Sequence, residues 1–152
     1  MHNKILKILA WFLVAIGIIA VFVISKSVGK AVATNNINES REEALVKGLN
    51  EAAIKVNKEC PKMLDKETRL DRVEVGTGMM GIYHHTLVNY NKQEIDKERL
   101  DNILKPKLIE NVCNNQEMQP SLRYGVTYVY AYKSKDNMEI VRYEISKKDC
   151  GF

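Results

Sequence analysis

The sequence has few of the residue patterns that mark catalytic or metal-binding motifs. It holds three cysteines in 152 residues, and no two of them form a C-x-x-C pair, which excludes a zinc ribbon and a thioredoxin-like redox motif. A serine nucleophile elbow, a phosphate-binding loop and a calcium loop are also absent from the sequence. We therefore expect no cofactor, no metal site and no enzymatic activity.

Beyond its N-terminal region the chain carries no net charge. Four lysines, Lys4, Lys7, Lys26 and Lys30, account for the formal net charge of +4, and the other basic residues balance the 19 acidic ones. A nucleic-acid-binding domain needs a basic face of its own. Nucleic acid is therefore excluded as the expected partner.

Charge is missing altogether from Ile8 to Ile24. A bilayer core takes about 20 mainly apolar helical residues, and residues 5–24 meet this requirement, so the lipid bilayer is their expected partner. We expect 1–30 to be a signal-anchor transmembrane helix with a cytoplasmic N-terminus, 31–39 a linker, and 40–152 a soluble extracytoplasmic domain. Residues 31–33 also resemble a signal-peptidase site, so cleavage after Ala33 stays open.

Two helices are predicted in the soluble part. Ser40 and Glu43 match a capping box, and apolar residues at three- and four-residue spacing extend this helix to about Lys58. A second helix is expected to begin at Asp96 and to end near Cys113, with Pro106 kinking or dividing it.

Two β-hairpins are predicted, at 70–90 and 126–146, each following one of the helices. Gly76, Gly78 and Gly81 match G-x-G-x-x-G, but a strand-like segment follows them, which favours a turn over a nucleotide site. This order predicts an α+β domain, αββαββ, with both helices on one face of a four-stranded antiparallel sheet.

The last hairpin carries a row of tyrosines whose side can be predicted. If Ser134 and Asn137 flank a two-residue turn, the row faces the same side as Val141, Tyr143 and Ile145, which is then the core side. A loop longer by one residue would reverse the sides and expose the row. It comprises Tyr128, Tyr130 and Tyr132.

The three cysteines are far apart in the sequence. Cys113 ends the second predicted helix and Cys150 follows the returning strand of the last hairpin, so we expect them to form a disulfide. A disulfide indicates an oxidising compartment, which favours a periplasmic domain. Cys60 is left as a buried free thiol or the partner in an intermolecular bond.

The candidate binding surface is formed by Tyr83, His84, His85, Arg69 and Asp71. Neighbouring residues on a strand point to opposite faces, so His84 and His85 are unsuited to chelating one metal ion. Paired carboxylates such as Asp65 and Asp71 would suit a hydrolase. A mutually neutralising loop explains the same residues.

Several short blocks resemble a group of small bacterial membrane-anchored envelope proteins to which no activity is attached. They are residues 57–61, 67–71, 86–90 and 125–127, with the closing Asp149-Cys150. The resemblance covers about residues 40–152 and implies a bacterial, extracytoplasmic protein.

These observations predict a non-enzymatic, single-pass protein of the bacterial inner membrane. Its periplasmic domain would bind another envelope protein or a cell-wall component, in an accessory or assembly role such as secretion or pilus formation. An immunity or inhibitor protein acting on a toxin or lytic enzyme, and a small envelope hydrolase, are the alternatives. A homo-oligomer is also compatible with the sequence.

Overall fold

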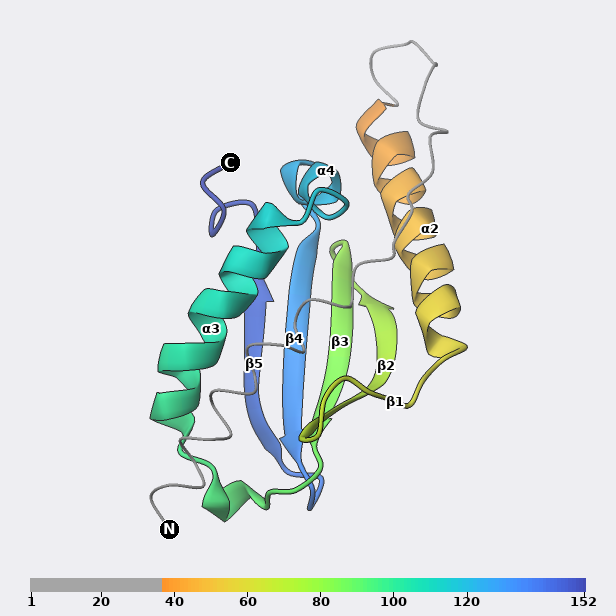
Figure 1. Cartoon of the computed structure of the whole chain (residues 1–152). Coiled ribbons are helices and arrows are strands. Elements are labelled where there is room, and N and C mark those ends of the chain that lie inside the picture. Colours follow the sequence, from red (N-terminus) through yellow and green to blue (C-terminus); the bar gives the residue numbers. More distant parts are fainter. Residues whose placement is uncertain (1–36) are drawn as a thin grey trace.

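The computed structural model describes residues 37–152, and the predicted transmembrane anchor lies outside them. The long helices are α2 (Ile37–Asn57) and α3 (Lys97–Asn114), and α4 (Gln119–Arg123) is a short one. The strands are β1 (Lys62–Met63), β2 (Thr68–Gly76), β3 (Met80–Leu87), β4 (Thr127–Ser134) and β5 (Glu139–Ile145), and a 3-10 turn, η2 (Lys92–Glu94), precedes α3. Figure 1 shows α2 beside β2 at one edge of the sheet and α3 beside β5 at the other.

The sheet has five strands in the order β1-β2-β3-β4-β5 and is mixed. Strands β3 and β4 pair in parallel, with Tyr83 opposite Tyr130, while the other neighbouring pairs are antiparallel. The predicted fold class, an αββαββ domain with a four-stranded antiparallel sheet, is therefore wrong.

The path of α3 explains the parallel pair. Its 18 residues span about 27 Å, close to the roughly 26 Å of the eight residues of β3. The helix thus returns the chain to the end of the sheet where β3 began, and β4 starts alongside β3 in the same direction. Parallel neighbours require such a crossover connection.

Local sequence accounts for the start of α3. Asp96 caps α3, because its carboxylate accepts a hydrogen bond from the backbone N–H of Arg99 at 3.1 Å. Pro106 lies within α3, which continues to Asn114 without being divided. Helix α2 begins before the predicted Ser40 cap and ends at Asn57.

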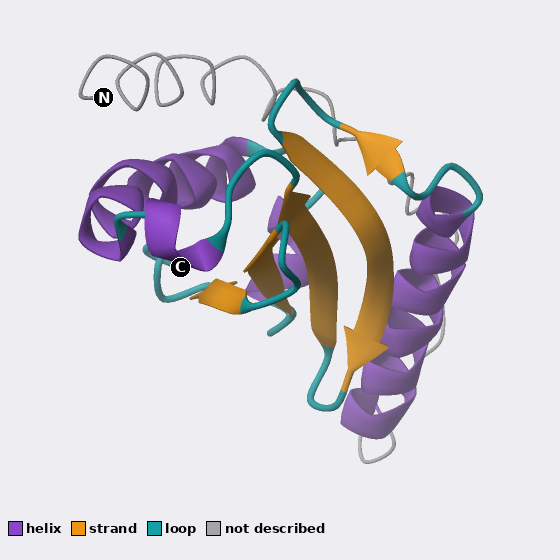
Figure 2. Ribbon diagram, turned by 90° about the horizontal axis from the view of Figure 1, so that it is seen from below, coloured by secondary structure: helices purple, strands orange, loops and turns teal. Residues whose placement is uncertain are grey.

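Both long helices pack on the same face of the sheet. A Cβ atom built on Gly81 would lie 3.7 Å from Leu49 Cδ2 of α2, and the Tyr143 hydroxyl donates to Asp101 of α3 at 2.7 Å. We call this the helix face; it comprises Leu70, Val73, Val75, Gly81, Tyr83, His85, Tyr128, Tyr130, Tyr132, Val141, Tyr143 and Ile145. Figure 2, in which the molecule is seen from below, shows α2 and α3 on either side of the strands.

The core lies between the helix face and the helices. Helix α2 contributes Leu49 and Ala53, and α3 contributes Leu100, Leu104, Leu108 and Val112, all of them buried. A spacing of four residues places each set on one side of its helix. Helix α3 therefore contributes more buried apolar side chains than α2, and it packs beside β5.

The opposite face of the sheet carries alternating charges, and within residues 37–152 neither long helix packs on it. We call it the polar face; it comprises Arg69, Asp71, Arg72, Glu74, Ile82, His84, Thr86, Val129, Ala131, Lys133, Arg142 and Glu144. The tyrosines of β4 lie on the helix face, as the register argument predicted.

Candidate functional site

The five residues predicted to form one binding surface are divided between the two faces. Tyr83 and His85 are on the helix face, where 4% and 2% of their surface is exposed. His84, Arg69 and Asp71 are on the polar face. The period of two along a strand separates His84 from His85, so these five side chains do not form a single surface.

His85 lies inside a stack of aromatic rings. Its ring centroid is 4.7 Å from that of Tyr132 and 6.0 Å from that of Tyr130, and both contacts are stacked. Burial lowers the pKa of His85 to about 4, because a charged imidazole would have no water around it at this buried position. Its Nδ1 atom has no hydrogen-bond partner. His85 is therefore a neutral part of the core.

Asp71 is the centre of a hydrogen-bonded group on the polar face. Its carboxylate accepts from Arg69 Nε at 2.6 Å and from Thr86 Oγ1 at 2.5 Å, and Lys133 Nζ lies 3.6 Å away. Desolvation would raise the pKa of Asp71, but these donors outweigh it and the pKa is lowered. A general acid needs a raised pKa, so Asp71 is suited to the ionised member of a carboxyl pair and not to the general acid.

The second carboxylate proposed for a hydrolase has a structural role. Asp65 Oδ1 accepts from the backbone N–H groups of Glu67 and Thr68, at 2.6 and 2.7 Å. Its hydrogen bonds close the turn before β2. Within residues 37–152 no group of three or more histidine, cysteine, aspartate or glutamate side chains is placed to hold a metal ion.

Cys60 is a free, partly buried thiol. Burial raises its pKa, and the negative charge of Asp71 acts in the same direction. A raised pKa makes the thiol a poor nucleophile near neutral pH. Whether Cys60 forms an intermolecular bond stays a prediction.

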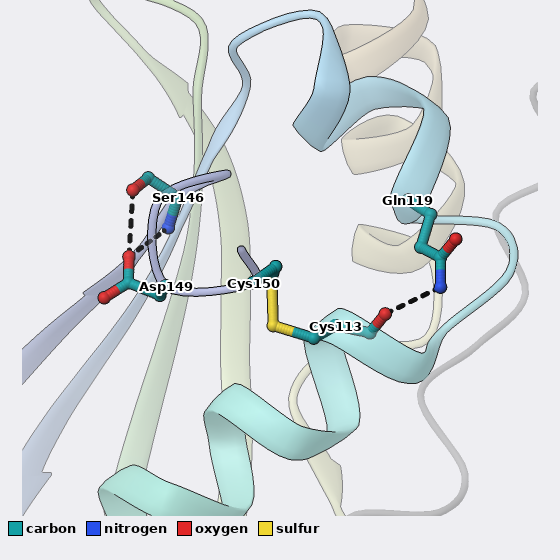
Figure 3. Close-up of a disulfide and its surroundings, with 5 residues drawn as sticks. All are labelled: Cys113, Gln119, Ser146, Asp149 and Cys150. Carbon is teal, nitrogen blue, oxygen red and sulfur yellow. Dashed lines mark hydrogen bonds between the residues drawn. A yellow bond between two sulfur atoms is a disulfide. The ribbon is translucent and has the colours of Figure 1, made fainter. Parts of the chain in front are cut away.

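Cys113 and Cys150 form a disulfide, the pairing predicted from the sequence. Their Cα atoms are 5.2 Å apart, and the bond ties the end of α3 to the C-terminal turn (Figure 3). Asp149 Oδ2 accepts from both the backbone N–H and the hydroxyl of Ser146, each at 2.8 Å. Gln119 Nε2 donates to the carbonyl oxygen of Cys113 at 2.7 Å. Figure 3 shows these contacts on either side of the disulfide.

The same end of the molecule exposes two aromatic rings, each covered by an arginine. Tyr124 is 55% exposed, and the Arg41 guanidinium carbon lies 5.1 Å from its ring centroid. Phe152 is 38% exposed, and the Arg123 guanidinium carbon lies 3.7 Å from its ring centroid. We call these four residues the aromatic end.

The aromatic end was not predicted from the sequence. Tyr124 follows α4, Arg41 lies in α2, and Phe152 follows the disulfide, so the group exists only once these three segments meet (Figure 1). The short helix α4 that carries Arg123 is fixed by buried contacts, since Leu122 is fully buried and the Ser121 and Tyr128 hydroxyls are 2.7 Å apart. A rigid base thus presents exposed aromatic and arginine side chains.

Solved structures of three bacterial proteins share the fold. A Pseudomonas aeruginosa protein described as secreted is 17% identical with a TM-score of 0.61, over 80% of this chain and 99% of that one. The pilotin EpsS of the Vibrio vulnificus type 2 secretion system is 11% identical with a TM-score of 0.61, over 74% and 96%. The pilotin AspS of the Vibrio cholerae type II secretion system is 13% identical with a TM-score of 0.55, over 76% and 100%. No curated protein matches the chain.

The predicted localisation, a single-pass inner-membrane protein with a periplasmic domain, is wrong. Across residues 37–152 the structure has no helix with the length and apolar character needed to cross a bilayer, and the structures that share its fold are those of a protein described as secreted and two pilotins. The division at residues 30 and 39 stays a prediction. The family assignment rests on residues 40–142: the chain belongs to the family described as domain of unknown function DUF8479.

Proposed function

We propose that this protein is a non-enzymatic accessory protein of the bacterial envelope that binds another protein through its aromatic end. The observation that carries the proposal is the pair of exposed, arginine-covered rings of Tyr124 and Phe152. Tyrosine, phenylalanine and arginine are enriched in protein interfaces, and tyrosine and arginine are frequent binding hot spots.

The rigidity of the aromatic end supports this role. The Cys113–Cys150 disulfide holds the segment before Phe152 against α3, and the backbone N–H of Phe152 donates to the carbonyl of Lys147 at 3.0 Å. A partner therefore loses little affinity to the ordering of this segment.

The fold also supports an accessory role. Two of the proteins that share it are pilotins of type II secretion systems, and the third is described as secreted. None of these descriptions is that of an enzyme. Fold alone does not assign function, so this likeness adds to the surface argument and does not replace it.

Site-specific photo-crosslinking in cells tests the proposal. A photoreactive residue replaces Tyr124 in the full chain, and the control replaces Met138, which is 50% exposed in the β4–β5 turn at the other end of the sheet. We expect a discrete adduct with another protein from position 124 and none from position 138. Equal adducts from both positions, or none from position 124, would contradict the proposal.

The purified pair then gives the energetic test. Tyr124→Ala should weaken binding by at least about 2 kcal/mol if Tyr124 is a hot spot, whereas Met138→Ala should leave it unchanged. The identity of the captured protein separates the two binding roles. A secretion or assembly component supports the accessory role, and a toxin or lytic enzyme supports the immunity or inhibitor alternative.

A further inference from the structure

The polar face repeats one charged motif on its two outer long strands. Arg72 and Glu74 alternate along β2, 3.2 Å apart, and Arg142 and Glu144 alternate along β5, 3.4 Å apart. Between a third and about half of each side chain is exposed, from 38% for Arg142 to 53% for Glu144. Both pairs are therefore available to a partner.

The register aligns the two motifs at the same height across the sheet. Arg72 pairs with His84, His84 with Ala131, and Ala131 with Arg142, so the two arginines end one row. Glu74, Ile82, Val129 and Glu144 form the next row by the same pairings. We call the row that ends in Arg72 and Arg142 the basic row, and the row that ends in Glu74 and Glu144 the acidic row. The two rows are about 7 Å apart, and the two charged residues at the ends of one row are about 14 Å apart.

The middle of each row is small or apolar. Ile82, Val129 and Ala131 separate the charged ends, and Ile82 and Val129 are 7% and 0% exposed. A facing layer is therefore contacted by the charged side chains at the two edges of the polar face, and the buried Val129 takes no part in that contact.

We propose that the polar face binds the polar face of a second copy of this chain, related by a twofold axis that runs parallel to the two rows and between them. This axis exchanges the basic row of one copy with the acidic row of the other. Each arginine then faces the glutamate of the same strand in the second copy, Arg72 with Glu74 and Arg142 with Glu144. The contact is isologous, so it closes as a dimer.

The charge pattern favours a twofold axis parallel to the rows over one parallel to the strands. A twofold axis parallel to the strands would place Arg72 against Arg142 and Glu74 against Glu144, and like charges in contact suppress such an arrangement. A face that complements itself in one orientation identifies a second copy as the partner. Charge pairs between exposed side chains are weakened by salt, so the dimer should be salt-sensitive.

Charge exchange between two variants of the full chain tests the dimer. The acidic variant carries Arg72→Glu and Arg142→Glu, and the basic variant carries Glu74→Arg and Glu144→Arg. Differently tagged copies are co-expressed and recovered in a non-denaturing detergent, and the co-recovered copy is quantified. We expect wild type to recover wild type, each variant to recover itself at least about tenfold less, and the acidic and basic variants to recover each other.

A matched control separates the pattern of the rows from net charge. Lys47→Glu with Lys55→Glu makes the same change in net charge as the acidic variant, on exposed residues of α2, and should leave self-association unchanged. The proposal is overturned if wild type does not recover wild type, if the acidic variant still recovers itself, or if two folded variants do not recover each other. If a double variant does not fold, Arg142→Glu and Glu144→Arg alone must give the same pattern.

The dimer is independent of the proposed function, because the polar face and the aromatic end are different surfaces. Self-association without an adduct from position 124 would contradict the proposed function and leave the dimer standing. An adduct from position 124 on a chain that does not self-associate would support the proposed function and contradict the dimer.

Discussion

The two faces of this sheet are built from neighbouring residues of the same strands and obey different physical rules. On β3 the buried His85 stacks on Tyr132, while the adjacent His84 places Nε2 2.8 Å from Glu74 Oε1 on the other side. On β5 the buried Tyr143 lies next to the exposed Glu144. One step along a strand therefore moves a side chain from the core to the surface.

The comparison separates residues that hold the fold from residues that are free to bind. Burial of large apolar side chains dominates folding stability, whereas exposed charge pairs contribute at most about 1 kcal/mol each. The helix face is thus constrained by packing. Substitutions of the exposed charged residues of the polar face can change recognition at little cost in stability, unlike substitutions of its buried Ile82 and Val129.

The largest difference is expected between Tyr132 and its neighbour Lys133 on β4. Tyr132 is 5% exposed and packs against His85 and Tyr143, so Tyr132→Ala should lower the unfolding free energy by about 4 kcal/mol, as for other buried aromatics. Lys133→Ala should lower it by less than about 1 kcal/mol. Denaturant unfolding measures both changes. Equal losses for the two variants would contradict the difference between the helix face and the polar face.

The next largest difference is in the response to acid. Burial lowers the pKa of His85 from an ordinary 6.5 to about 4. Between these values the unfolded chain binds a proton on this histidine that the folded chain does not. The contribution of the neutral His85 to the free energy of unfolding is therefore fully present above pH 6.5 and is lost as the pH falls towards 4. The shift corresponds to roughly 3 kcal/mol.

Two variants assign this loss to one histidine. His85→Gln should remove most of the slope of stability against pH between 6.5 and about 5, above the range in which the carboxyl groups begin to bind protons, whereas His84→Gln should keep it. The free energy of unfolding measured by denaturant across this range is the readout. A slope that survives His85→Gln would show that another group titrates there.

Those features of the fold that follow from local patterns could be predicted from the sequence. The tyrosine row is on the helix face although the predicted turn is wrong. A two-residue turn would place Tyr130 opposite Val141, whereas Tyr130 lies opposite Tyr143. The shift is two residues, and because side chains alternate with a period of two, an even shift keeps every residue on its face.

Features that depend on the path of the chain could not be predicted in this way. The parallel β3–β4 pair follows from where α3 returns the chain, and β1 is a two-residue strand at the edge of β2. The aromatic end joins Arg41 to Tyr124 across the fold. Neither hydrophobic period nor turn chemistry encodes such contacts.

A smaller effect is expected at Asp71, the most buried charge of the polar face. Asp71→Asn removes the charge that Arg69 and Thr86 contact and should cost about 1–2 kcal/mol. Glu74→Gln, at an exposed site, should cost less than about 1 kcal/mol. Because the pKa of Asp71 is lowered in the fold, its contribution is present above its ordinary pKa and is lost as the pH falls through the lowered value, in a more acidic window than that of His85.

The smallest effect on stability is expected at Arg142 and Glu144. These variants test most directly whether the polar face serves binding and the helix face serves folding. Arg142→Gln and Glu144→Gln should each change the unfolding free energy by less than about 0.5 kcal/mol, because the pair is exposed and 3.4 Å apart. The measurement belongs at low protein concentration and high salt, where association cannot add to apparent stability. At low salt the same variants should weaken self-association. If they instead lowered the stability of the dissociated chain by as much as Asp71→Asn, the polar face would serve to hold the fold together, and its charge rows would need no partner to explain them.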